Sequence, residues 1–319
     1  MNVPLAVEAT DVTKTFGSVR AVDDITVRVA AGEVYGVLGP NGAGKTTFLR
    51  MLFGLIRPDS GTVRVLGKTW DEDGVGVLDG VAGFIESPRF YPYLTGRQNL
   101  AGLGLLDGGL RPGLLEETLE LVEMTERADY KVGGYSYGMR QRLGVAASLL
   151  REPQLLVLDE PANGLDPAGI RDMRALVKRL AASGLTVLLS SHDMSEVEEI
   201  CDNVTIMRRG TVAFHGTIAS LRAMAPAPGH TLSTTDDRLA LALAEHHPGV
   251  AVRRDPEAAL IVTGAQPEVS SYVSALVRAG VDILGLTATE TPLEALFFML
   301  TDGDTHGEKA RTPQEEEAR

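Results

Sequence analysis

The pattern of hydrophobic and polar positions along the chain predicts strands and helices in alternation. Residues 25–29, Ile-Thr-Val-Arg-Val, alternate with period two, within a segment (5–38) that predicts short strands and an antiparallel β subdomain. Uninterrupted apolar runs at 34–38 and 155–158 predict buried strands. Because such strands alternate with segments of helical spacing, for example 167–182, we expect an α/β core with a mostly parallel sheet covered on both faces.

A helical segment interrupts this alternation between residues 87 and 150. Apolar positions have helical spacing at 96–106, 112–127 and 136–150, and an apolar stripe runs along the second of these segments. The alternation of strands and helices resumes at residue 155. Three helical segments in succession therefore predict a helical subdomain, about 87–150, inserted into the α/β core.

A smaller second domain is predicted after the Pro- and Gly-containing linker at 226–229. Its pattern runs strand, helix, strand, strand, helix, strand, which is the order of a ferredoxin-like α+β domain. We place the first domain at 1–225 and the second at 229–301, and we expect a disordered tail at 302–319, which is almost free of apolar residues. The pattern leaves open whether the second domain regulates the activity of the first domain, supports dimer contacts or has only an inert packing role.

Composition and charge narrow the classes of function. The net charge of −13 disfavours a general nucleic-acid-binding protein, so we expect no nucleic-acid partner. No uncharged apolar run reaches the roughly 18 residues of a membrane span, and the N-terminus lacks a basic region followed by an apolar core. The single cysteine, Cys201, excludes an internal disulfide and suits a reducing compartment. We expect a cytoplasmic protein whose membrane role, if it has one, comes through a partner.

The segment between the strand at 34–38 and the next helix carries the most informative motif. It contains the pattern G-x-x-x-x-G-K-[ST] and comprises Gly39, Pro40, Asn41, Gly42, Ala43, Gly44, Lys45, Thr46 and Thr47. Glycines let backbone N–H groups point inward, and the N-terminus of the helix adds partial positive charge. Lys45 can neutralise the β- and γ-phosphates, and Thr46 can ligand Mg²⁺. The motif predicts binding of a nucleoside triphosphate.

Two carboxylates follow the apolar strand at 155–158. Ligands of open α/β sheets bind outside the carboxyl ends of the strands, so we expect Asp159 and Glu160 beside the phosphate loop. Asp159 can hold Mg²⁺ through water, and Glu160 can accept a proton from the water that attacks the γ-phosphate. A solvated acidic turn is the alternative for this pair taken alone, but the phosphate loop upstream favours a site of hydrolysis.

A second anion site is predicted where the helix at 136–150 begins. Ser136 is a good N-cap, and Gly138 has no side chain to block close approach. With this segment just upstream of the Asp-Glu strand, the chain resembles the ATP-binding cassette (ABC) family, whose signature is roughly Leu-Ser-Gly-Gly-Gln. The resemblance covers about residues 5–220. It implies the P-loop NTPase fold and hydrolysis of ATP with Mg²⁺ as cofactor.

The resemblance also implies roles for residues outside these motifs. Phe16 would stack on adenine, although a core position is the alternative for this side chain. His192 would contact the γ-phosphate and orient the attacking water, and Asp166 ends a loop, 163–166, that would cross a dimer interface. In this family the signature of one chain covers the phosphate loop of another. The resemblance therefore implies a second ATP-binding subunit, as a homodimer with two Mg·ATP held between the chains.

Two departures from the family pattern carry information. The family's switch loop, which corresponds to residues 84–88 here, usually holds Gln, but Glu86 stands in that place. Glu86 can ligand Mg²⁺ or water but cannot donate an amide hydrogen bond. A solvated loop carboxylate is the alternative. Tyr137 and Met139 replace a glycine and the glutamine of the signature, so contacts at Ser136 and Gly138 are expected to survive better. The Glu variant resembles the bacitracin and lantibiotic exporter group.

The leading interpretation is the ATPase subunit of an exporter that energises a separate integral-membrane permease. Its switch loop and helical subdomain would receive the cytoplasmic helices of that permease, which would keep it on the inner face of the membrane. Family members with this layout often expel antimicrobial peptides or drugs. The alternative is a non-transport ABC ATPase acting on a nucleic-acid or ribosomal complex, and a subunit for import is a weaker third interpretation.

Overall fold

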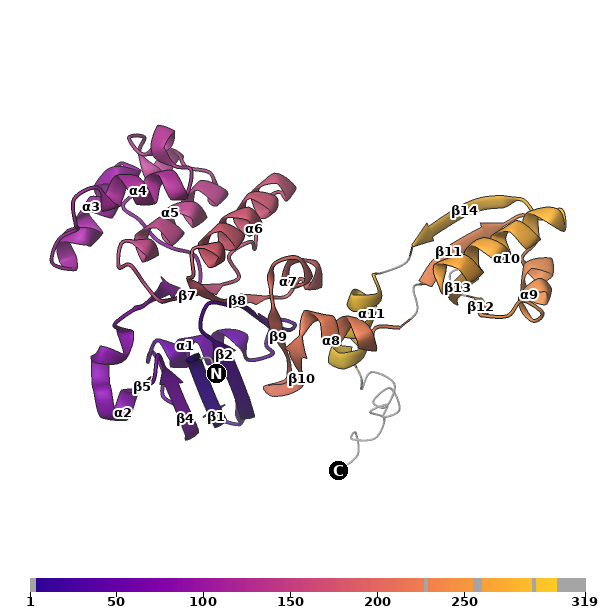
Figure 1. The fold of residues 1–319 in the computed structure, drawn as a ribbon, viewed down its shortest axis with the longest axis horizontal. Helices are drawn as coiled ribbons and strands as arrows, with labels where there is room; N and C mark the ends of the chain where they lie inside the picture. Colours follow the sequence, from indigo (N-terminus) through magenta and orange to yellow (C-terminus); the bar gives the residue numbers. More distant parts are fainter. Residues whose placement is uncertain (1–3, 227–228, 255–259, 289–290, 303–319) are drawn as a thin grey trace, which may run out of the picture. The chain divides into compact units, whose positions relative to one another are not determined.

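The computed structural model describes residues 4–226, 229–254, 260–288 and 291–302. The chain divides into two compact units, Met1–Ile218 and Ala219–Arg319 (Figure 1). Within these ranges, no helix has the length and hydrophobicity of a membrane span.

A six-stranded sheet forms the centre of the first unit. Its strand order is β10-β9-β3-β8-β7-β6, and each neighbouring pair except β10-β9 is parallel. The three middle strands β3, β8 and β7 are buried along their whole length, which is why the sequence shows uninterrupted apolar runs there. The strands are β3 (Val34–Leu38), β6 (Val81–Phe84), β7 (Leu155–Asp159), β8 (Thr186–Ser191), β9 (Asn203–Arg208) and β10 (Thr211–Thr217).

The antiparallel sheet of this unit has the order β2-β1-β4-β5. Its strands are β1 (Leu5–Phe16), β2 (Val19–Ala30), β4 (Ser60–Val65) and β5 (Lys68–Thr69). The prediction of short strands over 5–38 is wrong in length, because β1 and β2 each run for 12 residues. Register shifts interrupt their pairing, and Asp11 and Asp24 have positive φ angles of 53° and 52°. Such bulges break the period-two pattern without ending the strand.

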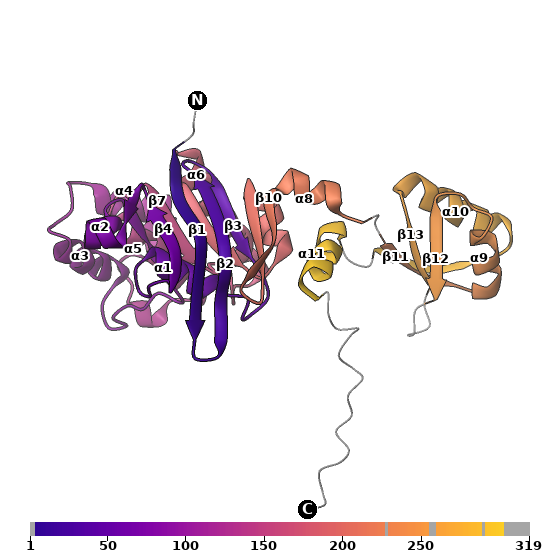
Figure 2. The same cartoon turned by 90° about the horizontal axis from the view of Figure 1, so that it is seen from below.

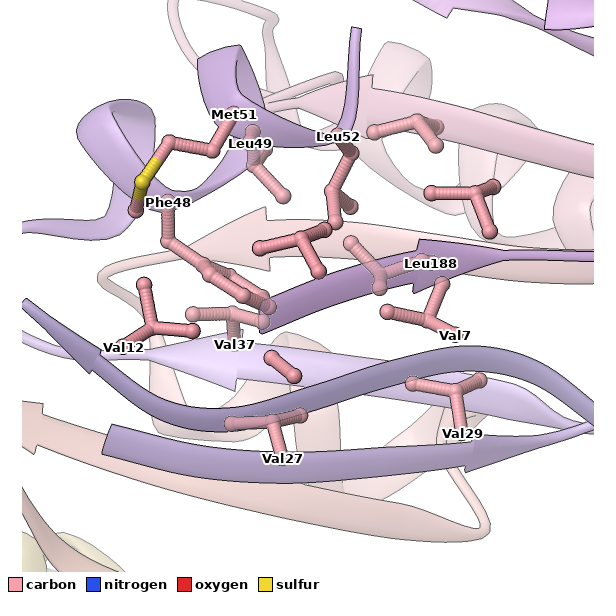
Figure 3. Packing of buried hydrophobic residues seen from close by; sticks show 14 of the residues in the cluster. Val7, Val12, Val27, Val29, Val37, Phe48, Leu49, Met51, Leu52 and Leu188 are labelled. Atoms are coloured by element: carbon pink, nitrogen blue, oxygen red, sulfur yellow. The ribbon is translucent and has the colours of Figure 1, made fainter. Parts of the chain in front are cut away.

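The core of the first unit forms around α1 (Lys45–Leu52), the helix that follows the phosphate loop. Phe48, Leu49, Met51 and Leu52 are fully or almost fully buried and pack against side chains of both sheets, such as Val7 and Leu188 (Figure 3). Burying each of these large side chains contributes about 1.5–3 kcal/mol. The core therefore fixes the helix whose first turn carries Lys45 and Thr46.

The helical subdomain contains α3 (Gly96–Leu106), α4 (Leu114–Leu121) and α5 (Tyr137–Leu149). These helices gather on one side of the central sheet (Figures 1 and 2). Thr95 and Gln98 form a capping box at the start of α3, and Ser136 caps α5, as predicted. Two further helices alternate with the strands of the central sheet, α6 (Pro167–Ala182) and α7 (Met194–Ile200).

Several short elements have no counterpart in the predictions from sequence. They are α2 (Trp70–Asp73), the 3₁₀ helix Gly74–Leu78, the strand β6 and α8 (Ile218–Met224). Each is at most seven residues long, too short for a hydrophobic period to stand out.

The second unit has the predicted ferredoxin-like order. Its four-stranded antiparallel sheet has the order β12-β13-β11-β14. Tyr272 of α10 is fully buried in its core and donates a hydrogen bond to the carbonyl of Ala240 at 2.8 Å. Asp302 ends α11, and the rest of the predicted tail, 303–319, lies outside the described residues. The elements are β11 (Gly229–Thr234), α9 (Asp237–Ala244), β12 (Val250–Arg254), β13 (Leu260–Gly264), α10 (Gln266–Arg278), β14 (Ile283–Ala288) and α11 (Pro292–Asp302).

Candidate functional site

The phosphate loop joins the carboxyl end of β3 to α1, as the sequence predicts. Gly42 and Gly44 have φ angles of 82° and 106°, a region that favours glycine. A Cβ atom on Gly44 would lie 2.3 Å from the carbonyl oxygen of Ala21 in β2, and one on Gly39 would lie 2.5 Å from the carbonyl oxygen of Met207. Backbone conformation therefore favours glycine at positions 42 and 44, and close contact with neighbouring strands requires it at positions 39 and 44.

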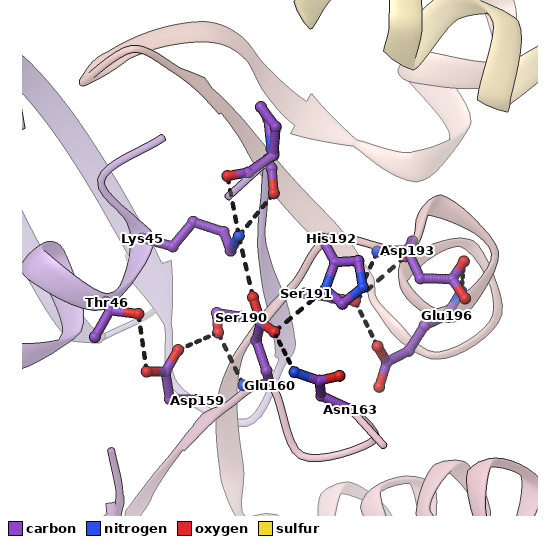
Figure 4. A network of polar contacts seen from close by, with 12 residues as sticks. Lys45, Thr46, Asp159, Glu160, Asn163, Ser190, Ser191, His192, Asp193 and Glu196 are labelled. Atoms are coloured by element: carbon purple, nitrogen blue, oxygen red, sulfur yellow. Dashed lines mark hydrogen bonds and ion pairs between the residues drawn. The ribbon is translucent and has the colours of Figure 1, made fainter. Parts of the chain in front are cut away.

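Lys45 reaches from the first turn of α1 into the centre of the site. Its side chain is only 4% exposed, and its Nζ donates to the carbonyl of Gly39 at 2.7 Å and of Pro40 at 3.3 Å (Figure 4). The same atom lies 3.2 Å from Oε1 of Glu160. A buried ammonium group therefore connects the loop with the carboxylate at the end of β7.

Asp159 and Glu160 lie at the carboxyl end of β7, beside the phosphate loop. The hydroxyl of Thr46 donates to Oδ2 of Asp159 at 3.0 Å. Ser190, at the neighbouring position of β8, donates to Oδ1 of Asp159 at 2.5 Å and accepts from the backbone N–H of Glu160 at 2.9 Å. No motif in the sequence marks Ser190, because only the pairing of β7 with β8 brings it beside both acids.

Glu160 contacts several polar side chains at this end of the sheet. Its Oε2 accepts a hydrogen bond from Asn163 at 3.0 Å and lies 3.2 Å from Nδ1 of His192. Its φ of 48° is in the left-handed region, which is strained for a residue with a side chain. The structure thus brings together Lys45, Glu160 and His192, which the sequence predicts to act together.

Glu86 lies just beyond β6 and is paired with a residue of α1. Its Oε1 accepts a hydrogen bond from Arg50 at 2.7 Å, and its side chain is 65% exposed. Its φ of 66° is again in the left-handed region. Arg50 is absent from the residues singled out in the sequence, since no motif marks it. The pairing connects the switch loop with the helix that begins at the phosphate loop.

A cavity of about 460 Å³ opens over the phosphate loop. Residues 41–47 and Glu160 line it, together with Val19, Arg20, Ala21 and Arg209, which no sequence pattern marks. Phe16 ends β1, shortly before Val19 in the sequence. Its side chain is 48% exposed, so the alternative that Phe16 is a core residue is wrong. Its ring lies 5.6 Å from the ammonium of Lys14.

The remaining predicted site residues lie elsewhere in the chain. Ser136, Gly138 and Asp166 are absent from the described residues that line the cavity over the phosphate loop. Ser136 caps α5 by accepting from the N–H of Met139 at 3.2 Å, and Asp166 caps α6 by accepting from the N–H of Gly169 at 2.9 Å. Within the part of the chain that the structure describes, neither the signature nor Asp166 therefore lines the cavity over the chain's own phosphate loop.

Glu196 of α7 belongs to a second, smaller cavity of about 140 Å³, which Glu160, Asn163 and His192 also line. The side chain accepts a short hydrogen bond from Ser191, and burial raises its pKa, opposed by that bond and by Arg174. Asp193 raises its pKa further, and His192 lowers it. Its Oε1 has no partner among the described residues. No motif identifies Glu196 in the sequence.

Replacing Glu196 by Gln is expected to stabilise the protein increasingly as pH rises. With its pKa raised above the unfolded value of 4.5, Glu196 keeps a proton in the folded state that the unfolded chain releases. Its contribution to stability is therefore greatest below pH 4.5 and falls as pH rises through the folded pKa. The Tm difference between Glu196→Gln and wild type should grow from mildly acidic to mildly alkaline solution, whereas Glu120→Gln, on the surface of α4, should follow wild type. Parallel curves for Glu196→Gln and wild type would contradict the expectation.

The fold and the loop geometry place the first unit among the P-loop NTPases. Its architecture is similar to that of cbiO1 from Clostridium perfringens, part of the ABC transporter complex cbiONQ, with a TM-score of 0.64 and 24% sequence identity over 69% of this chain and 92% of that one. At this identity the likeness concerns the fold alone.

Comparison of the sequence with known proteins gives the family. The model of the ABC transporter family matches residues 22–163. The bacitracin transport ATP-binding protein BcrA of Bacillus licheniformis is 36% identical over 94% of this chain and 99% of its own length. The daunorubicin/doxorubicin resistance ATP-binding protein DrrA of Streptomyces peucetius is 34% identical over 98% and 97%. The chain belongs to the ABC transporter family, and it binds and hydrolyses ATP.

Proposed function

We propose that the chain is the ATP-hydrolysing subunit of an exporter that moves antimicrobial peptides or drugs through a separate permease. The observation that carries the proposal is the similarity to BcrA over almost the full length of both chains, second unit included. A bacitracin transport ATP-binding protein and a daunorubicin/doxorubicin resistance ATP-binding protein are both related to this chain along almost their full lengths. Glu86 in the switch loop agrees with the exporter group.

The donor set beside the phosphate loop fits Mg²⁺. The hydroxyl of Thr46 and the carboxylate of Asp159 are hard oxygen ligands only 3.0 Å apart, and Mg²⁺ usually takes one or two carboxylates with waters and phosphate oxygens. Thr46 and Asp159 would hold the ion, with Ser190 fixing the orientation of the carboxylate. When bound, Mg²⁺ neutralises negative charge on the β- and γ-phosphates. Glu86, the other predicted ligand, is paired with Arg50 in this structure.

Within this arrangement Glu160 acts as the general base. Its carboxylate takes the proton of the attacking water, while Asn163 and His192 hold Oε2 from one side. Lys45 then offers its ammonium to the β- and γ-phosphates, next to the inward-facing loop N–H groups. The reaction therefore takes place at the carboxyl end of β7, where the base Glu160 and the phosphate-binding ammonium of Lys45 are already adjacent.

The complete site requires a second copy of the chain. Ser136, Gly138 and Asp166 do not line this chain's own cavity within the described residues, and yet the signature is an anion site by its capped helix start. We infer a homodimer in which the signature of each copy covers the phosphate loop of the other, with two ATP molecules between them. Closure on ATP and opening after hydrolysis would drive the permease.

The helical subdomain offers the surface for that permease. An apolar cavity of about 500 Å³ is lined by residues of α3 and of the loop before it, including Tyr91, Leu94, Leu103 and Leu106. Tyr91 is 62% and Leu106 85% exposed, so large apolar side chains of this groove face solvent. We assign this groove to a cytoplasmic helix of the permease, which would hold the chain on the inner face of the membrane.

Replacing Leu106 by Asp is expected to abolish co-purification with the permease and to remove drug resistance, since it places a charge in the groove. The ATPase activity of the isolated subunit should remain, because the groove lies away from the phosphate loop. Leu105→Asp is the matched control, since Leu105 is 77% exposed but does not line the groove. Co-purification of wild type with ribosomes or nucleic acid instead of a multi-span membrane protein would refute the exporter assignment.

Replacing Glu86 by Gln is expected to change both the ATPase rate and resistance while leaving Tm almost unchanged. The ion pair with Arg50 is exposed, and such pairs contribute only about 0–1 kcal/mol. If Glu86 contributed only to stability, its replacement would therefore have almost no effect on the ATPase rate or on resistance. Steady-state ATPase assays and inhibitory drug concentrations would decide, and unchanged values for both would remove Glu86 from the mechanism.

A further inference from the structure

Tyr137, which stands where the family signature has a glycine, points toward the switch loop. Its phenol oxygen lies 2.7 Å from the hydroxyl of Ser87 and accepts a hydrogen bond from Nε2 of Gln141 at 3.1 Å. Gln141 lies one turn further along α5 and is only 2% exposed. Because the phenol oxygen accepts from Gln141, its own proton is available to the Ser87 hydroxyl. The ring is therefore held in one orientation at the first residue of α5.

Ser87 directly follows Glu86, so the hydrogen bond joins two parts of the proposed machinery. Glu86 is paired with Arg50, which lies one turn after Thr46 on α1. A short path thus runs within a single chain from the helix of the phosphate loop, through the switch loop, to the start of the signature helix. Each of its steps is an ion pair, a hydrogen bond or a peptide bond.

A packing contact also holds the switch loop against α5. A Cβ atom on Gly144 would lie 2.5 Å from Cγ of Pro88, so only glycine allows Pro88 to approach the helix so closely. The ring of Tyr137 in turn lies near Gly164, where an added Cβ would be 3.5 Å from the ring. Tyr137 thereby contacts the switch loop and lies beside the loop that ends at Asp166.

We propose that Tyr137 is a positioning residue that makes the switch loop and the signature turn move as one body. Nucleotide bound at the phosphate loop would act on Glu86 through α1, and the Ser87–Tyr137 hydrogen bond would carry the resulting displacement to Ser136 and Gly138. This inference rests on the proposed function, because the signature matters only if it completes the site of a second copy. In this chain the tyrosine replaces the small residue of the signature and supplies the link.

The test is a double-mutant cycle with Tyr137→Phe, Ser87→Ala and the double variant. Tyr130→Phe is the control, because Tyr130 is 58% exposed and its phenol makes no hydrogen bond among those found in the described residues. We expect Tyr137→Phe to lower kcat about three- to tenfold, the effect of one hydrogen bond, with ATP affinity of the monomer unchanged. The double variant should be no slower than Tyr137→Phe alone. Effects that multiply, or a Tyr137→Phe rate equal to that of the Tyr130→Phe control, would overturn the proposal.

Hydrogen exchange gives a second measurement that needs no ATPase activity. Loss of the Tyr137 phenol should speed amide exchange in residues 85–90 and at the start of α5, whereas Tyr130→Phe should leave both segments unchanged. Unchanged exchange in Tyr137→Phe would overturn the proposal even in an active protein. An inactive wild type with faster exchange in Tyr137→Phe would instead refute the proposed function and support the link, so the two failures are distinguishable.

Discussion

Replacing Glu160 by Gln is expected to slow ATP hydrolysis by about 10²- to 10⁴-fold, the usual contribution of a general base, while ATP still binds. The amide keeps the size of the side chain but cannot take a proton from the attacking water. Its oxygen can still accept from Asn163, which donates to Oε2 of Glu160 at 3.0 Å. The variant should therefore accumulate as an ATP-bound dimer.

Single-turnover hydrolysis and gel filtration with ATP measure both parts of this expectation. Glu120→Gln removes an exposed carboxylate of α4 and should behave as wild type in both. If Glu160→Gln hydrolysed ATP at the wild-type rate, the base would have to be sought elsewhere. If it lost ATP binding as well, Glu160 would be acting through its ion pair with Lys45.

Replacing Lys45 by Ala is expected to weaken ATP binding by at least about 30-fold. Removing one partner of a buried, hydrogen-bonded charge pair costs about 2–5 kcal/mol. Lys45 is 4% exposed and lies 3.2 Å from Glu160. Its ammonium donates to the carbonyls of Gly39 and Pro40 in the phosphate loop. Without it, the phosphates would lose the buried ammonium that reaches into the centre of the site.

Lys178→Ala is the matched control for that experiment. Lys178 also forms an ion pair, with Glu199 at 3.1 Å, but its side chain is 48% exposed and lies on the surface of α6. Isothermal titration with ATP should show unchanged affinity for this control. Equal affinities of Lys45→Ala and wild type would contradict the assignment of the phosphate site.

Much of the fold could be predicted from the sequence, because its signals are local. The buried strands β3, β7 and β8 appear as apolar runs, and α3 and α6 were predicted at the bounds that the structure shows. The ferredoxin-like order of the second unit follows from the alternation of short patterns. The lengths of β1 and β2 could not be predicted, because residues with positive φ at their bulges interrupt the period while pairing continues.

The residues of the site that could not be predicted are brought together by contacts between segments that are distant in the sequence. Ser190 is 31 residues from Asp159, and Arg50 is 36 residues from Glu86, so neither pairing leaves a spacing that can be read along the chain. Glu196 accepts a hydrogen bond from Ser191, which is nearby in the chain, but only the fold brings it into one cavity with Glu160. By contrast, the phosphate loop and the Asp-Glu pair are contiguous, and contiguous motifs can be recognised before any fold is known.

The single hydroxyl of Ser190 restricts how this site can be altered, whether by natural variation or by design. It donates to Asp159 and accepts from the N–H of Glu160, so one side chain on β8 orients the carboxylate assigned to metal binding and anchors the backbone of the base. A substitution in the Ser190–Asp159 pair that is chosen to change metal preference would also shift Glu160, the general base. Variants with a different metal are therefore expected to need compensating changes on β8, and a library that varies β7 alone should yield few active members.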